Sequence, residues 1–115
     1  MNESFKTGYF KTPDFVFDLP LSAHAKLILI YFCRRSDKYG VSFPSVKTIS
    51  KDTGIKSHTS IRKYIRELID KGYITILQKG KNGVSNRYQL SDAILNMVRA
   101  NRLRPDEITP SNYDA

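Results

Sequence analysis

Residues 45–90 read SVKTISKDTGIKSHTSIRKYIRELIDKGYITILQKGKNGVSNRYQL, and this stretch decides the fold. Near its start, Val46 and Ile49 have the spacing of neighbours on one face of a helix. Ser45 precedes them and can cap this helix with its hydroxyl group. Gly54 then permits a tight turn. We therefore expect a helix of about two turns that ends at this glycine.

A second and strongly basic helix is expected to begin after Ser57 as its N-cap and to end at Lys71–Gly72. Its apolar residues fall on one face: Ile61, Tyr64, Ile65, Leu68 and Ile69. The other face presents His58, Thr59, Arg62, Lys63 and Arg66. A basic helix held at an angle by a short preceding helix has the geometry used to enter the major groove of DNA.

A β-hairpin is expected after the second helix. Residues 73–78 and 87–90 alternate apolar and polar side chains, as half-buried strands do. The tip between them, Lys79-Gly80-Lys81-Asn82-Gly83, contains glycine and asparagine, which permit positive φ, and two outward-pointing lysines. The pattern predicts a winged helix-turn-helix. Its class is α+β, mainly helical, with a three-helix core, a small antiparallel sheet as the wing and an additional C-terminal helix.

Three motifs carry a resemblance to a known family: FPS at 43–45, ISKDTG at 49–54 and IRELIDKGYI at 65–74. Through them, residues 10–90 resemble the winged helix-turn-helix domains of plasmid, phage and conjugative-element proteins. These include the N-terminal domains of replication initiators of the RepA and DnaD type. The resemblance implies a DNA-binding protein of a mobile genetic element.

The distribution of charge also favours a polyanionic partner. The chain has a net charge of +8, and residues 45–90 alone hold ten Lys/Arg against three Asp/Glu. Lysine and arginine side chains that neutralise phosphates release counterions, which adds affinity for DNA. A solvated basic face without a partner is the alternative interpretation.

We expect the partner to be double-stranded DNA, with helix 57–71 in the major groove and the wing, residues 79–87, on the backbone or in the minor groove. Arg62 is expected to read a guanine edge, with Thr59 and Ser60 as lesser candidates. Five cations are placed to meet phosphates: Lys56, Lys63, Lys79, Lys81 and Arg87. The complete predicted set is Lys56, Ser57, His58, Thr59, Ser60, Arg62, Lys63, Arg66, Lys79, Lys81, Asn82 and Arg87.

The chain is expected to divide into an N-terminal arm (1–12), the winged helix-turn-helix domain (13–90), a C-terminal helix (91–103) and a flexible tail (104–115). A replication initiator usually carries a further domain, so a chain of 115 residues suits an accessory factor or regulator better.

Within the domain, residues 13–18 are expected to be extended, with Phe15 and Phe17 facing one way. A helix from Ala23 to about Asp37, capped by Ser22, is apolar almost all round and should form the central pillar of the core. A short strand at 41–43 should pair with the edge of the hairpin and give a three-stranded sheet.

Enzymatic and metal-binding functions are not indicated. His24 and His58 stand near the starts of different helices, which leaves no plausible zinc-binding set. The wing tip lacks the spacing of a phosphate-binding loop, and no pair of carboxylates suggests acid–base chemistry. We expect no catalytic residue, metal, cofactor or small-molecule ligand.

The single cysteine, Cys33, lies in the apolar helix and is expected to be a buried thiol. No apolar run approaches the length of about 20 residues that a membrane span requires, and the start of the chain does not resemble a signal peptide. We expect a cytoplasmic protein that does not contact membranes.

Three functions remain open. The first is binding of double-stranded DNA as a regulator or accessory factor in replication, transcription or excision. The second is a winged helix reused for protein contacts in a replication or recombination complex. The third is RNA binding, which would call for aromatic side chains exposed on a sheet. The basic, hydroxyl-bearing face of the second helix favours the first.

A homodimer is a further expectation. The N-terminal aromatic residues and the stripe of Ile94, Leu95, Met97 and Val98 have no assigned partner in a three-helix core, and monomers seldom expose such a patch. Two copies could then read two half-sites about one helical turn apart. The alternative is that the last helix folds back on its own chain.

Overall fold

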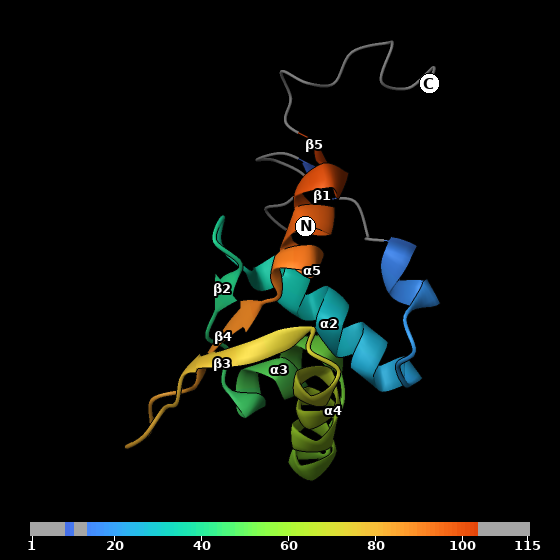
Figure 1. The fold of residues 1–115 in the computed structure, drawn as a ribbon. Helices are drawn as coiled ribbons and strands as arrows, with labels where there is room; N and C mark the ends of the chain where they lie inside the picture. Colours follow the sequence, from blue (N-terminus) through green and yellow to red (C-terminus); the bar gives the residue numbers. More distant parts are fainter. Residues whose placement is uncertain (1–8, 11–13, 104–115) are drawn as a thin grey trace, which may run out of the picture.

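The computed structural model describes residues 9–10 and 14–103. In this part of the chain, four α-helices pack with a three-stranded sheet, and a short ribbon pairs the segments nearest the two ends (Figure 1). The elements in chain order are β1 (Tyr9–Phe10), the 3-10 helix η1 (Asp14–Asp18), α2 (Ala23–Arg35), β2 (Val41–Ser42), α3 (Val46–Thr53), α4 (His58–Asp70), β3 (Ile74–Gln78), β4 (Arg87–Leu90), α5 (Asp92–Asn101) and β5 (Arg102–Leu103).

Helix α2 lies at the centre of the core, as its apolar sequence predicts. Its buried residues are Ala25, Ile28, Leu29, Phe32 and Cys33. Helices α3 and α4 and the sheet add Ile49, Ile61, Ile65, Leu68, Ile74, Tyr88 and Leu90 to the same cluster. Leu27 is 41% exposed, so α2 is covered on its core side and not all round. The exposure of its outward side is a small difference from the expectation that α2 would be covered almost all round.

Serine side chains cap the three central helices, which confirms the predicted starts. The Oγ atoms accept hydrogen bonds from backbone N–H groups in the pairs Ser22–Ala25, Ser45–Thr48 and Ser57–Ser60. Each such cap stabilises a helix by about 1 kcal/mol. After α3 and α4, Gly54 and Gly72 have φ angles of 83° and 81°, the left-handed conformation expected of them.

The predicted three-stranded sheet is also confirmed. Its order is β2-β4-β3, with antiparallel pairing throughout. Ile74 lies opposite Leu90, and both side chains are buried, whereas Ile76 further along β3 is 41% exposed. Strand β3 therefore enters the core only at its base, whereas β4 also contributes Tyr88, which is 5% exposed. Its tip extends beyond the body of the molecule (Figure 1).

The segment before α2 is a 3-10 helix, and the prediction of an extended segment there was wrong. Asp14–Asp18 forms η1, and within it Val16 is fully buried while Phe17 is 60% exposed. The run Phe15-Val16-Phe17 is compatible with a strand and with a 3-10 helix, because all three side chains are apolar and no alternation of polar and apolar residues distinguishes the two. In the 3-10 helix the β-branched Val16 points into the core, and Phe15 packs against the core from its edge.

Residues 1–8, 11–13 and 104–115 lie outside the described residues, and with them most of the expected arm and all of the expected tail. Tyr9 and Phe10 form β1, which pairs antiparallel with β5 in the register Tyr9↔Leu103. Helix α5 thus ends earlier than the predicted helix of 91–103, since residues 102–103 are a strand.

Helix α5 folds back on its own chain. Ile94, Leu95 and Val98 are buried at 3, 8 and 3% exposure, and the Leu95 side chain lies close to Gly40 in the turn before β2. The interpretation of the stripe as a dimer surface was wrong for these three residues, which belong to the core, whereas the fourth, Met97, is 45% exposed. The core extends further than three helices and a sheet, because the turn at Gly40 and the end of β4 leave an apolar surface that α5 covers.

Replacing Val98 by aspartate should destabilise the protein, because a carboxylate would enter a fully apolar environment. We expect the free energy of unfolding, measured by urea denaturation, to fall by about 3 kcal/mol or more. Asn96→Asp adds the same charge to an exposed position of α5 and should change the free energy of unfolding by less than about 0.5 kcal/mol. A Val98→Asp variant of undiminished stability and altered mass in sedimentation would place Val98 in an interface instead.

Candidate nucleic-acid interface

Helix α4 divides cleanly into a buried and an exposed face. Ile61, Ile65 and Leu68 are at most 5% exposed and pack into the core. At about 100° per residue, the opposite side of the helix carries a hydroxyl group and three cations. These exposed residues are Thr59, Arg62, Lys63 and Arg66. The predicted basic face therefore exists and is open to solvent.

The flank of α4 next to α2 is fixed by a polar contact. The Glu67 carboxylate accepts one hydrogen bond from the backbone N–H of Ser22 and one from its hydroxyl group, both 2.8 Å long. The bond from the backbone N–H and then that from the hydroxyl group lower the pKa of Glu67. Nearby, the rings of His24 and Tyr64 stack with their centroids 5.2 Å apart. These contacts hold the first turn of α2 against α4.

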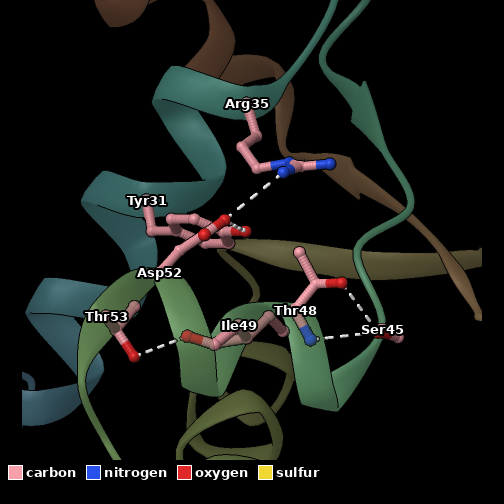
Figure 2. A network of polar contacts seen from close by, with 7 residues as sticks. All are labelled: Tyr31, Arg35, Ser45, Thr48, Ile49, Asp52 and Thr53. Carbon is pink, nitrogen blue, oxygen red and sulfur yellow. Dashed lines mark hydrogen bonds and ion pairs between the residues drawn. The ribbon is translucent and has the colours of Figure 1, made fainter. Parts of the chain in front are cut away.

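A second polar contact fixes α3 on α2 (Figure 2). The Tyr31 hydroxyl donates a 2.6 Å hydrogen bond to Asp52, and Arg35 donates one of 3.4 Å to the same carboxylate oxygen. Partial burial, followed by the bond to Asp52, raises the pKa of Tyr31 well above its ordinary value. Tyr31 therefore stays a neutral hydrogen-bond donor at physiological pH. Together, Glu67 and Asp52 attach both helices of the pair to one scaffold helix.

The wing ends in a compact turn. Asn82 and Gly83 have φ angles of 55° and 85°, and the Val84 N–H donates to the Lys81 carbonyl at 3.1 Å. Gly80 serves a different purpose, because a Cβ atom there would lie 1.9 Å from the Val84 carbonyl oxygen. The two sides of the loop thus approach more closely than any other residue would allow. Lys79 and Lys81 are exposed around an open hollow of about 320 Å³.

The predicted residues lie in three parts of the structure. Lys56 and Ser57 lie in the turn before α4, and His58, Thr59, Arg62, Lys63 and Arg66 lie along its exposed side. Lys79, Lys81, Asn82 and Arg87 belong to the wing. Ser60 is the exception in exposure: it is half-buried, and its N–H is bonded to Ser57.

Sequence reasoning missed two cations on α3. Lys47 and Lys51 are both exposed on this helix, which runs between α4 and the wing in Figure 1. Their spacing of four residues was the available signal, because it places both on one side of a helix. They add two exposed cations to the helix that precedes α4.

Neither a metal-binding cluster nor a membrane-spanning helix is found in residues 9–10 and 14–103. No group of three or more His, Cys, Asp or Glu side chains lies close enough to hold a metal ion there. Nor does this part of the chain contain a helix with the length and apolar character of a membrane span.

A comparison with protein families agrees with the geometry of α3 and α4. Residues 19–74 match the family described as a helix-turn-helix domain. Within this range, α3 and α4 are joined through the turn at Gly54 and have the helix-turn-helix arrangement. The helix-turn-helix is a DNA-binding motif. The match covers α2, β2, α3, α4 and the first residue of β3, so most of the wing and all of α5 lie beyond it.

The chain was also compared with curated proteins and with solved structures. No curated protein matches the chain. One solved structure, described as "Structure of GAS PerR-Zn-Zn", is similar at 17% sequence identity with a TM-score of 0.47. The alignment covers 70% of this chain and 54% of that one, so this chain spans about half the length of that protein.

The hydrogen bonds to Glu67 predict a stability that depends on pH. Because they lower its pKa below the ordinary 4.5, the ionised form stabilises the fold above that pH, and the contribution is lost as the pH falls through the lowered pKa. Glu67→Gln should therefore melt a few degrees below the wild type near neutral pH, and the difference should shrink at acid pH. Asp70→Asn, which removes an exposed carboxylate from the same helix, should not lower the melting temperature. A Glu67→Gln deficit that is equal at both pH values would contradict the assignment.

Proposed function

We propose that this protein binds double-stranded DNA, with α4 in the major groove and the wing on the backbone or in the minor groove. The observation that carries the proposal is the exposed face of α4, which combines Thr59, Arg62, Lys63 and Arg66 on a helix-turn-helix scaffold. Helix α4 and the wing tip lie at the same end of the molecule, away from α5 (Figure 1).

Within this proposal the residues have different roles. Arg62 lies one turn into α4 and can make two hydrogen bonds to a guanine edge, and Thr59 can contact a neighbouring base. The half-buried Ser60 is less well placed than Thr59. Cations on α3, in the turn and on the wing would neutralise phosphates: Lys47, Lys51, Lys56, Lys79, Lys81 and Arg87.

We further propose that the DNA belongs to a mobile genetic element and that the protein acts there, in the cytoplasm, as a regulator or accessory factor. This rests on the resemblance of residues 10–90 to domains of plasmid, phage and conjugative-element proteins. Footprinting on the element's own DNA would test it, because an origin repeat, a promoter and an attachment site differ in position. The expected homodimer would need a surface other than the buried residues Ile94, Leu95 and Val98 of α5. Sedimentation of the free protein would show whether it is a monomer or a dimer.

Arg62→Ala should lower affinity for the preferred DNA site by about 1–3 kcal/mol and affinity for random duplexes much less. The preferred site can be obtained by selection from a pool of random duplexes, and both affinities measured by fluorescence anisotropy at one salt concentration. Lys38→Ala, which removes an exposed cation from the turn after α2, is the control for charge alone. An equal loss on both kinds of DNA would make Arg62 a phosphate contact.

Lys79→Ala combined with Lys81→Ala should weaken binding to all duplexes alike, because phosphate contacts carry no sequence information. Each lost contact should reduce the slope of log affinity against log salt by about 0.9. Unaltered affinity and slope would show that the wing points away from DNA. If the wild type fails to bind duplexes even at low salt, α4 would instead be a surface for a protein partner.

A further inference from the structure

The wing is longer than the sheet that supports it. Strand β2 ends at Ser42, which is paired with Tyr88 in β4, so residues 79–87 continue beyond the last strand pair on that side. A hairpin that extends past its sheet is marginal in water unless other groups hold it. What holds the wing therefore decides whether its two lysines have a fixed position.

Phe43, the residue after β2, contacts the wing in two ways. Its carbonyl oxygen accepts a 2.6 Å hydrogen bond from the Ser85 hydroxyl group. Its ring, which is 58% exposed, has the Arg87 guanidinium carbon 5.2 Å from its centroid. The first contact replaces the backbone ladder that β2 no longer provides, and the second is a cation–π interaction.

The same residue is tied to the helix-turn-helix. Pro44, which follows it, is fully buried, and Ser45 is the N-cap of α3. Phe43 therefore connects the start of α3 to the wing. Inside the wing, the Gly80 N–H donates to Asn86 at 2.7 Å, and Asn86 donates to the Tyr88 hydroxyl at 3.3 Å. Because Tyr88 packs in the core, these hydrogen bonds also attach the β4 side of the wing to the core.

We infer that Phe43 is a positioning residue that holds the wing against the start of α3, so that Lys79 and Lys81 keep one place relative to α4. A wing held in this way loses less conformational freedom when it binds. The consequence for DNA affinity rests on the proposed function. The effect on the order of the wing in the protein without DNA does not.

The test uses the full chain with Phe43→Leu and Ser85→Ala combined, which removes the ring and the hydroxyl donor but keeps an apolar side chain. Backbone NMR order parameters of residues 79–86 should fall from about 0.85 to below about 0.6, while those of α3 and α4 stay high. The affinity for duplex DNA should fall about three- to tenfold. Phe43→Tyr retains the ring and should leave both quantities unchanged.

Tyr39→Leu is a matched control. Tyr39 is 60% exposed and has the Lys38 ammonium 5.2 Å from its ring, so it repeats the cation–π pair of Phe43 at the turn before β2, away from the wing. Its replacement should leave the order parameters of the wing unchanged. A comparable loss of order there would mean that any damage to the edge of the sheet loosens the hairpin, which would overturn the assignment to Phe43.

The remaining outcomes are distinguishable. Unchanged order parameters in the doubly substituted protein would overturn the inference. A loosened wing with undiminished DNA affinity would show that the wing is not held for DNA binding. If the wild type binds no DNA, the proposed function fails, and the order parameters alone still decide whether Phe43 positions the wing.

Discussion

The packing of α4 on α2 is the constraint on which the other features depend. Three apolar residues of α4 are buried against the core, and at the helix flank Glu67 accepts two hydrogen bonds from Ser22. The apolar contacts supply most of the stabilisation but permit rotation and sliding, because the hydrophobic effect has no direction. The hydrogen bonds fix the orientation of α4, and with it the direction in which Arg62 and Lys63 point.

The same scaffold helix also sets the position of α3. Tyr31 and Arg35 of α2 contact Asp52, two residues before Gly54, so α3 and α4 are each attached to α2 by a carboxylate. Removing either carboxylate would leave the apolar core intact. The angle between the two helices would then depend on their apolar packing and on the four-residue connection between them. The apolar core thus provides most of the stability, and the two carboxylates add a smaller contribution and set the geometry.

The local part of the structure could be predicted from the sequence, because it depends on residues a few positions apart. Ser45, Ser57, Gly54 and Gly72 were identified as helix boundaries from cap and turn chemistry, and the hairpin from its alternation. The contact between Ser22 and Glu67 joins residues 45 positions apart, and no local pattern marks it. The burial of Val98 was missed for a similar reason, since a stripe of apolar residues does not show whether its partner is the same chain or another. For the candidate interface, the predicted cations are exposed on α4 and on the wing, but Lys47 and Lys51 became evident only when α3 was placed between α4 and the wing.

The choice of serine as the cap of α3 and α4 has an electrostatic consequence. A carboxylate in the first turn would stabilise a helix by about 0.3–1 kcal/mol through its dipole, yet neither of these helices has one, whereas α5 at the other end of the molecule begins with Asp92. The positive ends of the two dipoles are therefore left uncompensated by acidic side chains in their own first turns. Their field adds to that of Lys47, Lys51 and Lys56. Because peptide groups and hydroxyls do not titrate in the physiological range, this part of the attraction for a polyanion is independent of pH.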